Sequence, residues 1–296
     1  MSEPRAEAAS PVAHADTMAA ARRLLQSARI TRPPTPVEDL LAACGLATEK
    51  FLLSDPFADR GLPVPLAKAR ADLRPLVRGM VDVADKVVYI HANLGREQQR
   101  FVTLHELGHY YLDWHNALLQ TCSEADLSPS ARRAWEREAN IFAKTCLFQG
   151  DRFAGDAARL AFGWRAARAL ARTYGASLEA TAWEFVQARP QPVLLLVATL
   201  GGSARATSRA TSGEPLLEVR YAVPSRAWRE RFGRGAIPAP GAPLPWEHPA
   251  TRLLLSGSRA VTPAQVSVSL PSGASVAVRA ELLCNGHDVL MLAQAL

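Results

Sequence analysis

The stretch HELGH at residues 105–109 constrains the fold of this chain more than any other feature. A helix places residues i and i+4 one turn apart on one face, so His105 and His109 can both reach a single metal ion. Glu106, the neighbour of His105 along the chain, can then reach a metal-bound water and act as a general base. The pattern therefore predicts a helix at this position and a catalytic zinc site on it.

The flanking sequence supports a helix over roughly 95–115. Its core face consists of apolar or small residues that repeat at helical spacing: Phe101, Leu104, Gly108 and Leu112. Residues 79–92 come before it and have the alternation and the β-branched content of a hairpin, with Asp85 near the turn. We therefore expect a hairpin followed by the helix that carries the two histidines.

A catalytic zinc site keeps three protein ligands, so a third ligand is needed. His115 has the spacing of the zinc peptidases whose signature is HExxHxxGxxH. Leu112 stands where that signature has glycine, and a leucine resists the left-handed turn that would bring His115 back to the metal. We therefore expect His115 to cap the helix or to lie at its C-terminal end, outside the ligand set.

A carboxylate from the next predicted helix, which begins near Ser128, is the alternative third ligand. Glu136 and Glu138 both flank the apolar stripe of that helix, so a helical wheel does not separate them. Asn140 follows Glu136 by one turn and can bond to the other nitrogen of a ligand histidine, which favours Glu136. Glu138 is then expected to be an exposed carboxylate that pairs with a nearby arginine.

The chain of 296 residues is long enough for two domains, and its pattern changes along its length. Residues 1–17 have almost nothing to bury and are predicted to be a disordered tail. Residues 18–150 contain the predicted metal site, and residues 151–190 have the pattern of a helix–turn–helix-like pair. Strand-like runs separated by loops fill residues 191–296. The expected fold class is α+β, with a mainly helical first domain and a strand-rich C-terminal domain.

Composition places the chain among ordinary globular proteins, with a net charge of +6 and an isoelectric point near 9.4. Its four cysteines lack the spacing of a metal site or a disulfide framework. We see no basic segment followed by an apolar core at the N-terminus and no apolar run long enough to span a bilayer. These features favour a reducing cytoplasm and no membrane partner.

The predicted hairpin, the segment REQQRFVTLHELGHYYL and the segment EREANIFAKTCL together resemble the ImmA/IrrE family of metallopeptidases. The resemblance is specific over residues 79–150 and looser over residues 18–60. That family pairs the HExxH helix with a later helix that carries Glu and, four residues on, Asn. This sequence departs from the family pattern in a long proline-rich insert around residues 55–76. A substrate groove beside this insert can differ from that of other family members.

The resemblance implies a zincin-like domain with Glu106 as catalytic base and Asn140 beside the ligands. The ligand set that it implies is His105, His109 and Glu136, with Zn²⁺ as the metal and another divalent ion such as Mn²⁺ as a substitute in the cell. The hairpin strand before the helix can align an extended peptide by edge pairing. Tyr110 and Tyr111 are near enough in sequence to be considered as oxyanion donors, but on a helix we expect them to pack or to point away.

In that family the substrate is typically a helix–turn–helix transcriptional repressor, and its cleavage switches on the genes that it silenced. The resemblance therefore implies site-specific cleavage of an XRE-type repressor and derepression of stress or DNA-damage response genes. It also implies that residues 151–190 are the helix–turn–helix-like region that follows the peptidase. Residues 191–296 have the length and strand content of a GAF-like sensor domain, at which a small molecule or stress signal would act.

The competing interpretation is a DNA-binding transcriptional regulator with a structural or relict zinc site. The helix–turn–helix-like pair and the basic isoelectric point favour it. The recognition position, Leu178 to Ala188, carries Glu179 and Glu184 and no lysine or arginine. Because readers of the major groove usually place basic or amide side chains there, the sequence disfavours direct DNA binding.

Overall fold

The computed structural model describes residues 11–52, 78–115, 129–201 and 217–296. Its helices and strands form an α+β fold, as the sequence predicts. The chain divides into two compact units: Met1–Arg152 with Thr173–Ala176, and Phe153–Arg172 with Ser177–Leu296. The proline-rich insert predicted around residues 55–76 lies outside the described residues.

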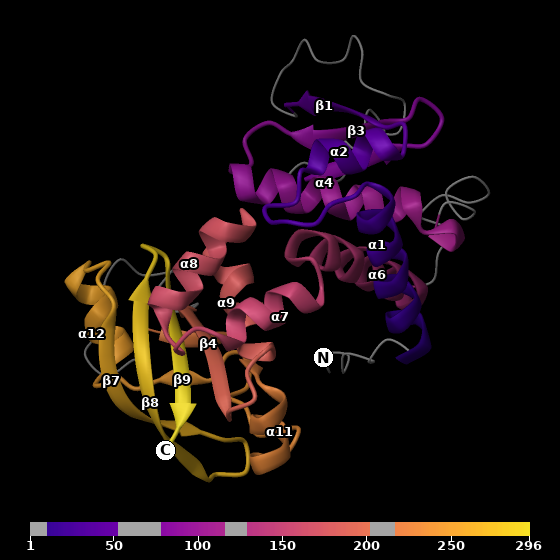
Figure 1. The fold of residues 1–296 in the computed structure, drawn as a ribbon. Helices are drawn as coiled ribbons and strands as arrows, with labels where there is room; N and C mark the ends of the chain where they lie inside the picture. Colours follow the sequence, from indigo (N-terminus) through magenta and orange to yellow (C-terminus); the bar gives the residue numbers. More distant parts are fainter. Residues whose placement is uncertain (1–10, 53–77, 116–128, 202–216) are drawn as a thin grey trace. The chain divides into compact units, whose positions relative to one another are not determined.

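The first unit packs helices against a small sheet (Figure 1). Its described helices are α1 (Pro11–Ser27), α2 (Val37–Ala43), α4 (Arg96–Tyr111) and α6 (Pro129–Phe148). Its described strands are β1 (Ala47–Phe51), β2 (Gly79–Asp82) and β3 (Val87–His91), in the order β1-β3-β2. The predicted hairpin is present as the antiparallel pair β2 and β3, and β1 joins β3 in parallel. Strand β2 is therefore an edge of the described sheet.

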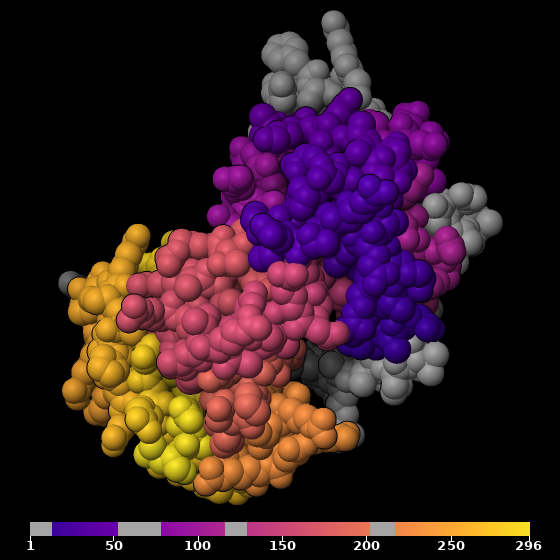
Figure 2. Space-filling view, in the orientation of Figure 1, coloured from indigo at the N-terminus to yellow at the C-terminus, as the bar shows by residue number. Residues whose placement is uncertain are grey.

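Helix α4 lies in the middle of this unit, between the sheet and α6. One side of α4 contacts β2 and β3, and the other contacts α6, where the fully buried Phe142 packs against Gly108 and Tyr111. Helices α1 and α2 pack on α6 and α4, and their indigo surface covers them in Figure 2. Burial on several sides holds α4 in place.

One prediction about the start of the chain is wrong. Helix α1 begins at Pro11, so residues 11–17, predicted as part of a disordered tail, are helical, and Thr17 is fully buried. The error arises because α1 packs on α6, a contact between distant segments that the local sequence pattern does not reveal.

The second unit is built on a six-stranded antiparallel sheet in the order β6-β5-β4-β9-β8-β7. Its strands are β4 (Val193–Leu200), β5 (Leu217–Pro224), β6 (Pro243–Leu244), β7 (Thr262–Ser269), β8 (Ser275–Cys284) and β9 (Asp288–Ala295). Its helices are most of α7 (Asp151–Ala158) and α8 (Trp164–Tyr174), together with α9 (Leu178–Gln187), α11 (Arg226–Phe232) and α12 (Pro249–Ser256). Trp228 of α11 and Leu253 of α12 belong to the core on one face of the sheet. Among the described residues, no helix is both long enough and apolar enough to cross a membrane.

Helix α9 is attached to the sheet of its own unit. It packs against β4 and β5, and the carboxylate of Glu179 accepts a hydrogen bond of 2.6 Å from the hydroxyl of Tyr221. Glu179 also pairs with Arg220, whose guanidinium donates to Asp288 at 2.7 Å. The sequence separates residues 151–190 from residues 191–296, whereas the structure groups most of the former with the latter.

Candidate metal centre

His105 and His109 of α4 face Glu136 of α6. Nε2 of His105 lies 3.2 Å from Oε2 of Glu136 and 3.1 Å from Nε2 of His109. Oε1 of Glu136 lies 3.8 Å from Nε2 of His109. One potential ligand atom from each residue lies within 4.8 Å of the other two. Two imidazoles and a carboxylate therefore point at one small space.

A glycine in α4 allows this approach. A Cβ atom added at Gly108 would lie 3.1 Å from Cδ1 of Phe142, tighter than ordinary van der Waals contact. Ala139, one turn before Ala143 on α6, is also fully buried. Small side chains at these positions let the two helices pack closely, which brings Glu136 within reach of both histidines.

These residues fit a divalent metal ion. Two imidazole nitrogens and one carboxylate oxygen are a common ligand set of catalytic zinc sites, which keep a fourth position open. The side chain of Glu136 is 41% exposed and that of His109 is 5% exposed, so the cluster has one side near solvent and one in the core. A metal ion held here by His105, His109 and Glu136 would be accessible to a substrate.

The pKa shifts of the three residues have distinct causes. Burial, followed by the charges of His105 and His115, lowers the pKa of His109 to about 2, so its imidazole is neutral at physiological pH. Burial alone would lower the pKa of His105, but the hydrogen bond with Glu136 and the charge of Glu106 raise it overall. The hydrogen bond from His105 lowers the pKa of Glu136 despite its burial. A metal ion that binds Nε2 of His105 would displace a proton held on that nitrogen.

The carboxylate of Glu106 is buried between α4 and strand β2. A Cβ atom added at Gly79 of β2 would lie 3.0 Å from Oε1 of Glu106. The charge of Glu106 also raises the pKa of His105, which indicates that the carboxylate lies near that imidazole. The predicted general base is therefore beside the cluster and next to the edge strand.

His115 and Glu138 make a contact that the sequence did not predict. Helix α4 ends at Tyr111, because Leu112 is extended at φ −76° and ψ 110°, and residues 113–115 are helical again. His115 is fully buried, with its Nδ1 atom 3.1 Å from Nδ1 of His109. Its Nε2 atom lies 2.8 Å from Oε2 of Glu138. Of the two expected alternatives for His115, its ring does not cap the helix, but the residue does lie just beyond the C-terminal end of α4 and outside the cluster of His105, His109 and Glu136. The prediction of an exposed Glu138 paired with an arginine is wrong, because its side chain is 13% exposed and contacts His115.

Asn140 lies near His105, one of the two histidines of the cluster. A hydrogen bond with Asn140 contributes to raising the pKa of His105. The Nδ1 atom of His105, however, is buried with no hydrogen-bond partner among the described residues. The two histidines of the cluster therefore differ, since His109 has a partner on its second nitrogen and His105 has none within the described ranges.

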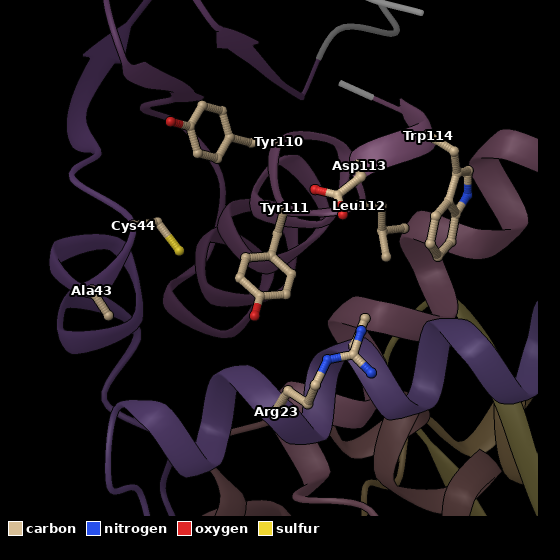
Figure 3. A pocket seen from close by; sticks show the side chains of 9 residues that line it. Arg23, Ala43, Cys44, Tyr110, Tyr111, Leu112, Asp113 and Trp114 are labelled. Atoms are coloured by element: carbon tan, nitrogen blue, oxygen red, sulfur yellow. The ribbon is translucent and has the colours of Figure 1, made fainter. Parts of the chain in front are cut away.

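The two tyrosines that follow His109 line a separate hollow (Figure 3). This cavity of about 400 Å³ lies between α1, the end of α2 and the end of α4, and its walls include Arg23, Cys44 and Asp113. Tyr111 also packs against Phe142, with the ring centroids 5.6 Å apart. Figure 3 shows the ring of Tyr111 directed towards Arg23, so we assign it no role as an oxyanion donor.

Comparison with known proteins identifies the domain. A family model described as the IrrE N-terminal-like domain of peptidase family M78 matches residues 63–184. The radiation response metalloprotease IrrE of Deinococcus radiodurans is 27% identical over 184 residues, which cover 60% of this chain and 54% of that protein. Both matches make this part of the chain similar to the ImmA/IrrE family. It spans about half the length of that curated relative.

The ImmA/IrrE match includes all three residues of the cluster, and such a metallopeptidase-type domain is compatible with a divalent metal at His105, His109 and Glu136. A solved structure, titled Mycobacterium tuberculosis transcriptional regulator, aligns with a TM-score of 0.55 and 16% identity. The alignment covers 95% of this chain and 76% of that one. At this identity the likeness concerns the fold alone.

Proposed function

We propose that this chain is a zinc-dependent endopeptidase. The observation that carries the proposal is the cluster of His105, His109 and Glu136, with ligand atoms within 4.8 Å of one another and the carboxylate of Glu106 beside it. The family match and the metalloprotease relative support the same reaction class. Zn²⁺ suits this ligand set best, and Mn²⁺ is the expected substitute in the cell.

Glu106 performs the proton transfers in this mechanism. When bound, Zn²⁺ supplies a Lewis acid that activates water and polarises the peptide carbonyl. Glu106 takes the proton of the attacking water and passes it to the leaving amine. Its burial against Gly79 keeps the carboxylate at one place, and the adjacent His105 and His109 keep it next to the reacting groups.

Strand β2 provides a way to align the substrate. One edge of β2 pairs with β3, and no strand among the described residues pairs with the other edge. An extended peptide that adds to this free edge receives main-chain hydrogen bonds. Because Gly79 of β2 touches Glu106, such a peptide would pass close to the general base.

The proposed substrate is a helix–turn–helix repressor of the XRE type, cleaved at one site so that stress or DNA-damage response genes are derepressed. The name of the Deinococcus relative, a radiation response metalloprotease, supports a protease that acts in a response to DNA damage or stress. We further propose that residues 191–296 act as a GAF-like sensor for a small molecule or stress signal. The six-stranded antiparallel sheet covered by helices is compatible with that role.

The test is to mix the purified full chain with candidate helix–turn–helix repressors from its own genome, with and without a chelator. Cleavage of one repressor at one site, lost with chelator and restored by Zn²⁺, is the expected result. If no candidate is cleaved, the proposed substrate is wrong. If peptide bonds are cleaved equally well in the presence of chelator, the metal-dependent mechanism is wrong.

The alternative, a DNA-binding regulator, gains no support from the packing of α9. Glu179 on this helix is paired with Arg220 and Tyr221, and the helix packs against β4 and β5. Part of the surface of α9 is therefore occupied by contacts within its own unit, whereas a recognition helix must insert its surface into the major groove of DNA. A gel-shift assay run beside the cleavage assay distinguishes the two functions.

A further inference from the structure

A line of buried polar contacts runs from the metal centre into the protein. Nε2 of His109 faces the cluster, and its Nδ1 lies 3.1 Å from Nδ1 of His115. Nε2 of His115 lies 2.8 Å from Oε2 of Glu138. Trp114 donates its indole N–H to the same oxygen at 2.7 Å. His115 is fully buried and the side chain of Glu138 is 13% exposed, so these contacts are largely shielded from water.

The direction of these hydrogen bonds follows from the chemistry of the two ends. A carboxylate oxygen only accepts, so Nε2 of His115 carries a proton and donates it to Glu138. The neutral His115 then has a bare Nδ1, which accepts from Nδ1–H of His109. His109 is left with a bare Nε2 directed at the cluster, which is the tautomer that binds a metal ion through this nitrogen.

Hydrogen bonds that ran in the opposite direction, from His115 to His109, would be unfavourable both at Glu138 and at the metal centre. If Nδ1 of His115 donated to His109, then a neutral His115 would present a lone pair to the carboxylate of Glu138. His109 would in turn carry its proton on Nε2, where it blocks coordination. The carboxylate of Glu138 therefore determines the tautomer of His109, although the two residues interact only through the imidazole of His115.

Packing supports the same arrangement. The ring of Trp135 lies against both imidazoles, with centroid distances of 4.0 Å to His109 and 5.1 Å to His115. The extended conformation of Leu112, which ends α4, is what returns His115 to this position. His105 has no comparable support, since its Nδ1 is without a hydrogen-bond partner among the described residues.

We propose that His115 and Glu138 are positioning residues that hold His109 in the orientation and tautomer in which Nε2 binds the catalytic metal ion. The inference rests on the proposed function, because it assumes that the cluster binds a metal ion. It assigns His109 as the preorganised ligand of the pair and His105 as the ligand whose orientation metal binding completes. The line Glu138–His115–His109 extends the usual carboxylate–histidine–metal arrangement by one imidazole.

The test measures Zn²⁺ affinity of the full chain by competition with a chromogenic chelator. Replacement of such supporting groups typically lowers metal affinity by about 10- to 100-fold. We expect a loss in this range for His115→Phe, which keeps an aromatic ring but removes both nitrogens, and for Glu138→Ala. Glu138→Gln should lose less, because its amide oxygen still accepts from His115. The double variant His115→Phe/Glu138→Ala should bind no more weakly than His115→Phe, because Glu138 acts through His115.

Matched controls separate positioning from general damage. Glu97→Ala, in the exposed first turn of α4, should leave Zn²⁺ affinity unchanged. The thermal unfolding midpoint of each metal-free variant reports whether the fold is retained. The wild type gives a readout that needs no variant, since ¹⁵N spectra of the zinc-loaded chain should show the His115 proton on Nε2 and the His109 proton on Nδ1.

The outcomes are distinguishable. Wild-type protein that binds no Zn²⁺ would overturn the proposed function and this inference with it. Tight binding by wild type together with affinities within twofold in folded His115→Phe would overturn the inference alone. If His115→Phe does not fold, the spectra decide, and a His115 proton on Nδ1 would sink the proposal.

Discussion

Gly79 of strand β2 faces the carboxylate of Glu106 in helix α4, with no space for a side chain between them. A Cβ atom added at Gly79 would lie 3.0 Å from Oε1 of Glu106 and 2.5 Å from Cγ1 of Val102. Such distances leave no room for any side chain at Gly79. The absence of a side chain therefore brings the edge strand, on which a peptide can align, against the residue proposed to activate water.

The first prediction concerns this contact. Gly79→Val should force β2 away from α4, or displace Glu106, and should lower kcat for repressor cleavage by at least about 10-fold, since small misplacements of catalytic groups are costly. Overpacking should also reduce the free energy of unfolding by about 1–3 kcal/mol. Chemical denaturation and cleavage kinetics measure the two effects. Gly155→Ala, at a site with no neighbouring atom within 4 Å, is the control, and equal kinetics in both variants would contradict the prediction.

The second prediction isolates the general base. Glu106→Gln keeps the shape of the side chain but cannot take a proton, so kcat should fall by about 10²- to 10⁴-fold. Zn²⁺ affinity should stay close to that of wild type, because Glu106 is not among the proposed ligands. Metal titration and cleavage assays on the same preparation measure both quantities. Full activity in this variant would sink the mechanism.

The third prediction concerns metal removal. A ligand that binds only the folded protein stabilises it by about 2.7 kcal/mol at 100 times its Kd. Zn²⁺ at that concentration should therefore raise the unfolding midpoint of the wild-type chain, and a chelator should reverse the shift. Glu136→Ala should abolish most of this shift, because it removes the only carboxylate in the cluster of His105, His109 and Glu136. A shift of equal size in the variant would show that Glu136 is not a ligand.

The fourth prediction is a pH dependence in the second unit. His248 caps α12, since its Nδ1 accepts a hydrogen bond from the backbone N–H of Ala250 at 3.1 Å. Burial lowers the pKa of His248 below its ordinary value of 6.5. The unfolded chain therefore binds a proton more readily than the folded one, and stability should fall as the pH decreases from about 6.5 through the folded pKa. Loss of the cap should cost about 0.5–2 kcal/mol.

Hydrogen exchange at the Ala250 amide measures this effect locally. Protection should decrease with falling pH in the wild type, after correction for the intrinsic rate. In His248→Asn, a side chain that caps a helix without titrating, it should not change. The same pH dependence in both proteins would mean that another group is responsible.

Some features of this protein are decided locally and could be predicted from the sequence. The helical period places His105 and His109 on one face with Glu106 beside them, whatever packs against the helix. The alternation in residues 79–92 similarly determines a hairpin, and the structure contains it as β2 and β3. These predictions succeeded because residues close together along the chain determine both features.

Other features depended on packing between distant segments, and only the tertiary structure decided them. Glu136 and Glu138 are equivalent on a helical wheel, but the close approach of α4 and α6 directs Glu136 to the cluster and Glu138 to His115. The sequence placed His115 outside the ligand set, as a cap or at the end of the helix, but it did not predict that Nδ1 of His115 would lie 3.1 Å from the second nitrogen of His109. The sequence by itself determined the placement of the two histidines and of the adjacent Glu106, because local helical geometry sets it. Burial between helices decided the third residue of the cluster and the contacts behind His109.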